Sequence, residues 1–193
     1  MSSQRLPGKV LFPFRGSTIL KYTYDKCKNI KGIKSVFVLT SNESEDDEIE
    51  KMCNLNKINI FRGSLSNVLE RFQNAAKLHC DSEDFVIRIC ADSPLIDEVL
   101  LQDFSNLISE KYFYFSTRFL DGDSFKSSTG KGNNIDAIKV SELCKLKPDN
   151  ELIREHIIYG FEFGKKFKLY KTKSLFNEND SIDTLEDYKR LSL

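Results

Sequence analysis

A regular alternation constrains this chain most: short apolar runs are followed by segments whose apolar residues recur at helical spacing. The runs, rich in β-branched and aromatic residues, predict strands at Val36–Leu39, Ile58–Phe61, Phe85–Cys90, Tyr112–Ser116, Ile135–Val140 and Phe167–Thr172. Apolar stripes between them predict helices around Ile49 to Cys53, Val68 to Ala76 and Leu100 to Ile108. This alternation of strands and helices along the chain predicts an α/β sheet with right-handed crossovers. The later part of the chain is less regular, and we expect an antiparallel strand or a small lobe there.

Length and charge favour one globular domain over residues 1–193. A chain of 193 residues buries about two-thirds of its surface on folding. Lys plus Arg and Asp plus Glu both number 29, so no bulk basic field exists to gather nucleic acid. No apolar run reaches the roughly 18 residues of a membrane helix, and no signal pattern opens the chain. We therefore expect a cytoplasmic protein that binds neither nucleic acid nor membrane; a homodimer is left open.

The metal-ligating residue types point to oxygen ligands. The five cysteines are scattered without a C-x-x-C pair, and only two histidines are present. This distribution argues against a disulfide framework and against a zinc site. A catalytic metal would therefore be held by carboxylates, and the candidate hard ion is Mg²⁺.

The first candidate segment is the string MSSQRLPGK at the start of the chain. Ser3 supplies a hydroxyl, Arg5 and Lys9 supply positive charge, and Gly8 allows close approach of the backbone. This combination suits a triphosphate, although an ordinary basic tail is the alternative. The segment is not a P-loop, and a later GKG at 130–132 is predicted to be a surface loop.

Two further segments follow predicted strands. In FRGSLSNVLER, at 61–71, Arg62 and Ser64 come after a strand, and Asn67 opens a helix whose amides would face an anion. A plain strand–loop–helix connection is the alternative. In RICADSPLID, Asp92 emerges at the carboxyl end of a strand, where α/β enzymes place ligands. The alternative role, capping the next helix, suits Asp97 better.

The last segment is SIDTLED, at 181–187. Asp183 follows a short apolar stretch, and Thr184 is placed to cap the final helix. We expect Asp92 and Asp183 to converge on one Mg²⁺, although only the tertiary structure can bring them together.

Together these segments resemble the cytidylyltransferase family that activates acidic sugars. The resemblance is closest to its spore-coat polysaccharide type, which is related to CMP-3-deoxy-octulosonate and CMP-acylneuraminate synthetases. MSSQRLPGKVL is similar to the family's nucleotide-binding loop, FRGSLSNVLERF to its second signature and VIRICADSPLID to its metal-binding strand end. IREHI and IDTLEDYKRL resemble its later segments, and all of these occur in family order.

The resemblance implies a Rossmann-like nucleotidyltransferase fold of three layers with a mixed, mostly parallel sheet. It also implies transfer of CMP from CTP to an acidic sugar of the octulosonate or nonulosonate type, with release of pyrophosphate, for surface polysaccharide. By the resemblance, the triphosphate would be bound by Ser3, Arg5 and Lys9, of which Arg5 and Lys9 would be catalytic, and the nucleotide by Arg62 and Ser64. The sugar would be bound by Arg88, Asp136, Arg154 and His156, and Mg²⁺ by Asp92 and Asp183.

One departure concerns the sheet. In the family, a strand and an arginine lead into the nucleotide-binding loop, and neither precedes Ser3 here. We therefore expect either that the true start lies upstream or that the usual first strand is lacking, with the gap closed by a neighbouring strand or left as a groove. Two alternative functions stay open. One is a degenerate, non-catalytic paralogue that binds nucleotide or a partner protein, and the other is a nucleotidyltransferase that uses another base or a sugar phosphate.

Overall fold

The computed structural model describes residues 3–108, 111–121, 124–147, 151–157, 167–169 and 179–192. Its helices are α1 (Ile19–Lys28), α2 (Asp47–Leu55), α3 (Val68–His79), α4 (Glu98–Leu107), α5 (Val140–Leu143), α6 (Glu151–Glu155) and α7 (Leu185–Ser192), with 3-10 turns η1 (Lys9–Leu11) and η2 (Ser44–Asp46). Its strands are β1 (Pro13–Phe14), β2 (Ser17–Thr18), β3 (Phe37–Ser41), β4 (Asn59–Gly63), β5 (Phe85–Arg88), β6 (Tyr114–Ser116), β7 (Arg118–Asp121), β8 (Ser124–Ser127), β9 (Asp136–Lys139) and β10 (Phe167–Leu169).

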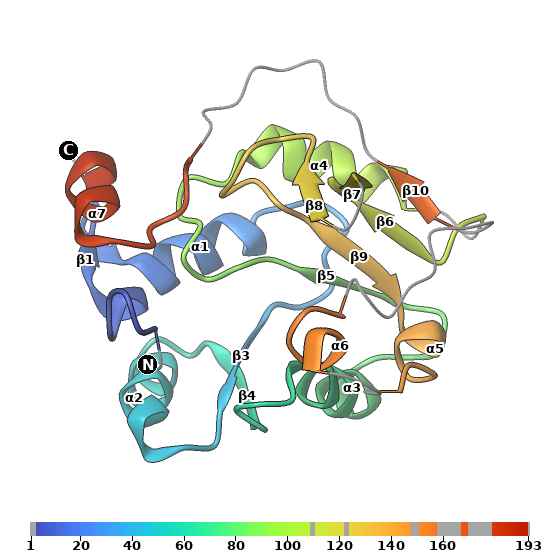
Figure 1. Ribbon diagram of the computed structural model, residues 1–193. Coiled ribbons are helices and arrows are strands. Elements are labelled where there is room, and N and C mark those ends of the chain that lie inside the picture. Colours follow the sequence, from blue (N-terminus) through green and yellow to red (C-terminus); the bar gives the residue numbers. More distant parts are fainter. Residues whose placement is uncertain are drawn as a thin grey trace.

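The described strands form two main sheets (Figure 1). β3 pairs in parallel with β4, while a four-stranded sheet has the order β10-β6-β9-β5. β9 runs antiparallel to both β5 and β6, whereas β10 is parallel to β6. The fold is therefore mixed, and the antiparallel strand expected in the later part of the chain is confirmed. Two small hairpins, β1-β2 and β7-β8, complete the pairing.

Each predicted strand overlaps an observed one, with residues 170–172 of the last lying outside the described residues.

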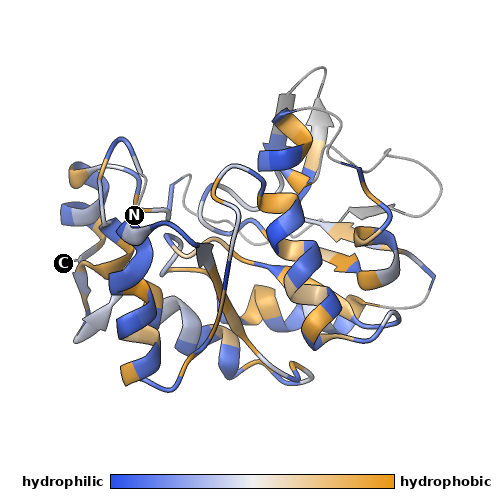
Figure 2. Cartoon of the chain, turned by 90° about the horizontal axis from the view of Figure 1, so that it is seen from below, coloured by the Kyte–Doolittle hydropathy of each residue, from blue (hydrophilic) through white to orange (hydrophobic). Residues whose placement is uncertain are grey.

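Helices cover both faces of the four-stranded sheet. Side chains alternate along β6, so Phe115 packs with Leu100 and Phe104 of α4, while its neighbour Tyr114 packs with Leu69 of α3. The helices are amphipathic, with apolar stripes turned toward the sheet (Figure 2). Three layers result, helix on sheet on helix, as the sequence predicts.

Side chains cap the first turns of α3, α4 and α7. The Asn67 side chain accepts a hydrogen bond from the backbone N–H of Glu70 at 3.1 Å, and Asp97 accepts one from Leu100 at 2.7 Å. The Thr184 hydroxyl accepts from the N–H of Asp187 at 3.2 Å. The predicted capping roles of Asp97 and Thr184 are thus confirmed. Across the described ranges, no helix combines the length and the apolar character that crossing a membrane requires.

The expected gap in the sheet is present. β3 pairs with β4 on one edge and β5 pairs with β9 on one edge, and no described strand pairs with the remaining edge of either. None of the strands in the described ranges fills the gap, and a groove lies there, as the second alternative predicts.

Candidate functional site

Three charged side chains from distant parts of the chain meet at the carboxyl end of β5. The Nζ of Lys9 donates to Asp92 Oδ2 at 2.5 Å, to Asp183 Oδ1 at 3.0 Å and to the carbonyl of Ile182 at 2.6 Å. The N–H of Ile182 donates to the carbonyl of Asp92 at 2.9 Å, which ties the last segment of the chain to the loop after β5. Asp92 and Asp183 therefore lie on either side of one buried ammonium group.

Two further cations contact the same carboxylate. Arg5 Nη2 donates to Asp183 Oδ1 at 2.9 Å, and Lys131 Nζ pairs with Asp183 Oδ2. Ser3 shapes the loop that carries Arg5, because its hydroxyl accepts from the N–H of Leu6 at 3.3 Å. Three cations against two carboxylates give the centre an excess of positive charge.

The loop that presents Lys131 is fixed by its glycines. Gly132 has a φ of 97°, and a Cβ there would lie 2.5 Å from the carbonyl carbon of Asp180. The carbonyl of Lys131 accepts from the N–H of Asp180 at 2.8 Å. Sequence reasoning treats this GKG only as a surface loop and so misses Lys131. The signal available was a lysine between two glycines, which does not by itself show what it contacts.

The pKa of Asp183 is lowered to about 2 from an ordinary value of 3.8. Burial acts in the opposite direction, but hydrogen bonds from Lys131 and Lys9 and their positive charges outweigh it. Asp183 is therefore a carboxylate at neutral pH, as a metal ligand must be.

The donor set fits Mg²⁺. This ion is usually held by one or two carboxylates and takes its remaining ligands from substrate phosphates and water. Asp92 and Asp183 supply two hard oxygen donors at one point, and the Asp92 side chain stays 25% exposed on the approach side. Among the residues that the structure describes, no group of three or more His, Cys, Asp or Glu residues could hold a metal alone. An ion here would thus depend on a phosphate ligand to complete its shell.

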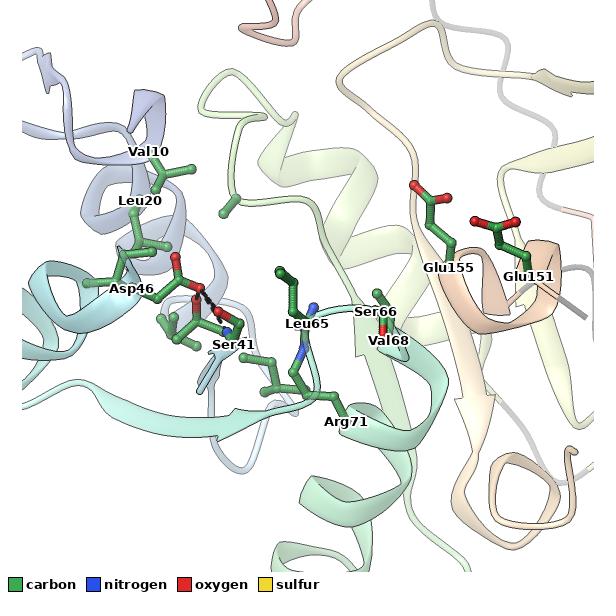
Figure 3. A pocket seen from close by; sticks show the side chains of 15 residues that line it. Val10, Leu20, Ser41, Asp46, Leu65, Ser66, Val68, Arg71, Glu151 and Glu155 are labelled. Carbon is green, nitrogen blue, oxygen red and sulfur yellow. Dashed lines mark hydrogen bonds between the residues drawn. The ribbon is translucent and has the colours of Figure 1, made fainter. Parts of the chain in front are cut away.

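A cavity of about 520 Å³ lies next to this charged centre. Val10 and Ala91 line it, and each directly follows or precedes a residue of the centre, Lys9 and Asp92. Its floor comes from the carboxyl end of β3, and the loop before α3 and the helix α6 form other walls. Figure 3 shows Ser41 and Asp46 on one side, Glu151 and Glu155 on the other, and Arg71 and Leu65 between them.

Arg71 lines this cavity and has a hydrogen-bond donor without a partner. Its Nη1 donates to the carbonyl of Ser64 at 2.9 Å, but its buried Nε has no hydrogen-bond partner. Burial lowers the pKa of this guanidinium, partly offset by Asp46. An unpaired buried donor costs about 1–3 kcal/mol, so a ligand acceptor there would be bound favourably. Sequence reasoning missed this role, although Arg71 is the last residue of the FRGSLSNVLER segment.

The structure places Arg62 and Ser64 differently from Arg71. The guanidinium of Arg62 donates to the carbonyl of Ser41 at 2.9 Å and to Glu50 at 2.6 Å, which joins β4 to β3 and α2. The Ser64 hydroxyl accepts from the N–H of Asn67 at 3.1 Å and so shapes the loop before α3. Both contacts are within the protein, and nucleotide contact by these two residues stays a prediction.

Of the four residues predicted to face a sugar, Arg88 and Asp136 come together. They are directly opposite each other in the β5-β9 pairing, with Arg88 Nη1 3.8 Å from Asp136 Oδ2. Arg118 Nη2 also pairs with Asp136 Oδ2, and the hydroxyls of Tyr114 and Ser116 donate to Oδ1 at 2.9 and 2.7 Å. Asp136 is thus a buried carboxylate with several donors.

The other two residues lie at the end of α6. His156 is half-buried, and burial lowers the pKa of its imidazole, with Arg88 and Arg118 acting in the same direction against Glu155. It lines the same groove as Arg88. Arg154 is exposed.

An α/β sheet with a cavity and a cluster of cations at the carboxyl ends of its strands is typical of nucleotide-binding enzymes. Comparison with known proteins makes this specific: the profile of the cytidylyltransferase family matches residues 1–189. The chain belongs to that family.

Several individual proteins are similar to this chain. A solved cytidylyltransferase from Leptospira borgpetersenii is 30% identical, with a TM-score of 0.85 over 100% of this chain and 81% of the other. An uncharacterized protein of Methanocaldococcus jannaschii is 32% identical over 97% of this chain and 76% of its own length. An 8-amino-3,8-dideoxy-manno-octulosonate cytidylyltransferase of Shewanella frigidimarina is 28% identical, but over only 54% of this chain and 42% of its own length.

Proposed function

We propose that this chain transfers CMP from CTP to an acidic sugar of the octulosonate or nonulosonate type, releasing pyrophosphate. The observation that carries the proposal is the cavity of about 520 Å³ whose lining residues Val10 and Ala91 adjoin Lys9 and Asp92 of the charged centre. A nucleoside and its phosphates need two such adjoining environments, one enclosed and one cationic.

The cations of the centre would bind the triphosphate. Lys9, Arg5 and Lys131 all contact Asp183 or Asp92 now, and a triphosphate would compete with these carboxylates for them. In the reaction a sugar hydroxyl oxygen forms a bond to the α-phosphorus while the bond to the pyrophosphate oxygen breaks. Cations fixed beside the phosphates would stabilise the negative charge that develops on the leaving group.

Asp92 and Asp183 would hold Mg²⁺ when the triphosphate is bound. The ion would supply charge neutralisation and orientation of the phosphates. This assignment is supported by the oxygen donors described above and by the lowered pKa of Asp183.

Arg71 would recognise the nucleoside, because its side chain lines the cavity and its buried Nε has no hydrogen-bond partner, and a cytosine ring offers acceptors to a guanidinium. The acidic sugar would lie toward Arg88 and His156. The guanidinium of Arg88 would attract the carboxylate of the acid, and the imidazole of His156, neutral because burial lowers its pKa, would offer a hydrogen bond. The name of the Shewanella relative supports an octulosonate-type acid as the substrate. A role in making surface polysaccharide and a location in the cytoplasm both stay predictions.

A thermal-shift comparison of CTP, ATP and GTP, each with Mg²⁺, tests the nucleotide. Specific binding raises the melting temperature by mass action, so CTP should give the largest increase. Equal increases for all three triphosphates would contradict the cytidine assignment while leaving phosphate binding in place.

Pyrophosphate release in the presence of a 3-deoxy-octulosonate tests the transfer. A second candidate function is a nucleotide-binding protein without transferase activity, because none of the described strands pairs with the open edges of β3 and β5 beside the site. CTP-specific stabilisation without pyrophosphate release would favour that second function.

A further inference from the structure

The ammonium group of Lys9 lies between the two carboxylates of the charged centre. Its Nζ donates to Asp92 Oδ2 at 2.5 Å, to Asp183 Oδ1 at 3.0 Å and to the carbonyl of Ile182 at 2.6 Å. An ammonium group has three N–H donors, and these three acceptors use all of them. Several oxygens around one positive charge are also what a hard metal cation requires. Lys9 therefore places a cation of the chain itself at the point where a metal ion would bind.

Burial separates Lys9 from the other two cations of the centre. The side chain of Lys9 is only 9% exposed, whereas those of Arg5 and Lys131 are 62% and 50% exposed. Among the described residues, only Lys9 pairs with both carboxylates, while Arg5 and Lys131 pair with Asp183 alone. All three cations add positive charge to the centre, but Lys9 is the one that fills the space between Asp92 and Asp183.

The backbone at Lys9 is anchored, while its side chain can change partners. Leu6 and Val10, on either side, each belong to an apolar cluster of the core. The N–H of Lys9 donates to the carbonyl of Leu6 at 3.2 Å, which fixes the turn between them. A lysine side chain is a flexible four-carbon stem that carries a point charge. Nζ can therefore move to a neighbouring phosphate oxygen by a change of rotamer, without movement of the loop.

The charges at the centre decide which ligand can move Lys9. Three cations meet two carboxylates there, so a divalent cation that arrives alone meets carboxylates that are already neutralised and an excess of positive charge. A triphosphate instead brings several negative charges and strong acceptors for an ammonium group. Once Nζ has moved to the phosphates, the carboxylates lack a cation, and a buried carboxylate without a partner is costly. A metal ion would then be bound favourably between them.

We propose that Lys9 is a tethered cation that keeps divalent metal ions off Asp92 and Asp183 until a triphosphate binds. The triphosphate draws Nζ onto its oxygens, and the position between the two carboxylates then becomes a metal site. Triphosphate and metal ion therefore bind with positive coupling, and each raises the affinity for the other by the same factor, typically about 5- to 150-fold. This inference rests on the proposed function in that Asp92 and Asp183 hold the ion, and it is independent of the base and the sugar.

The test measures binding of Mn²⁺ without nucleotide, by the loss of the free ion's electron paramagnetic resonance signal. Mn²⁺ is the probe because it takes the same oxygen ligands as Mg²⁺. We expect Lys9→Met to bind Mn²⁺ about tenfold or more tightly than the original chain, because the space between two carboxylates is opened. The matched control, Lys131→Met, removes an exposed cation from the same centre but leaves Lys9 in place, so its gain should stay below about threefold. Far-UV circular dichroism verifies folding, and Lys9→Gln, which keeps an N–H donor for the carboxylates, replaces Lys9→Met if that variant does not fold.

Equal affinity of the original chain and the Lys9 variant for Mn²⁺ would overturn the proposal. Equal gains in the Lys9 and Lys131 variants would also overturn it, because net charge and not the position of Lys9 would then keep the ion away. None of these readouts needs CTP, a sugar or turnover. Pyrophosphate release by an original chain that binds Mn²⁺ as tightly as the Lys9 variant would leave the proposed function standing while this inference fails. A gain confined to the Lys9 variant, in a chain that releases no pyrophosphate, would do the reverse.

Discussion

Replacing Asp183 by Asn removes the carboxylate that joins Lys9, Arg5 and Lys131. The side chain of Asp183 is only 9% exposed, so solvent screens these contacts weakly. Its pKa falls from 3.8 unfolded to about 2 folded, and each pKa unit corresponds to about 1.4 kcal/mol. We therefore expect Asp183→Asn to lower the free energy of unfolding by about 2 kcal/mol at pH 7.

The pH dependence has a definite sign. Because folding lowers this pKa, the stabilisation is complete above the unfolded value of 3.8 and is lost as the pH falls toward about 2. The difference between the original chain and Asp183→Asn should thus be constant from pH 7 to pH 5 and shrink below pH 4.

Urea unfolding followed by far-UV circular dichroism measures this difference, since the chain has no tryptophan for fluorescence. The matched control is Glu48→Gln, which breaks an exposed ion pair with Lys51 on α2 and should leave stability unchanged. Equal stability of Asp183→Asn and the original chain at pH 7, or a difference that persists undiminished at pH 3, would refute the reasoning.

Three further predictions concern the site. Asp92→Asn should lower turnover with CTP about 100-fold or more while the fold is retained, and near-normal turnover at low Mg²⁺ would remove it from the ligand set. Gly132→Ala should destabilise the chain by about 2 kcal/mol or more in the same urea assay, because the added Cβ is strained at a positive φ and overlaps the backbone. The control Gly16→Ala, with a φ of 80° and open space around it, should cost less, and equal losses of stability would contradict the overlap. Arg71→Lys should weaken CTP binding about tenfold by calorimetry with little change in melting temperature, and an unchanged Kd would exclude Arg71 from recognition.

The sequence by itself determined the local structure. Helix starts at Asn67, Asp97 and Thr184 were readable because a capping side chain bonds to a backbone N–H only three residues away. Strands and helices were likewise readable from apolar spacing, because each element's pattern is set by its own repeat and by the layer it packs against. The gap between β3 and β5 was also foreseen, because it followed from the order of the predicted elements.

The tertiary structure alone decided which side chains meet. Lys9 contacts Asp92 and Asp183 across sequence separations of 83 and 174 residues, and no local pattern encodes such distances. The roles of Lys131 and Arg71 depend in the same way on a neighbouring segment, which is why sequence reasoning passed over both. Contacts of this kind arise from how the layers pack, and the groove beside β5 is defined by two strand edges that only the folded sheets bring face to face.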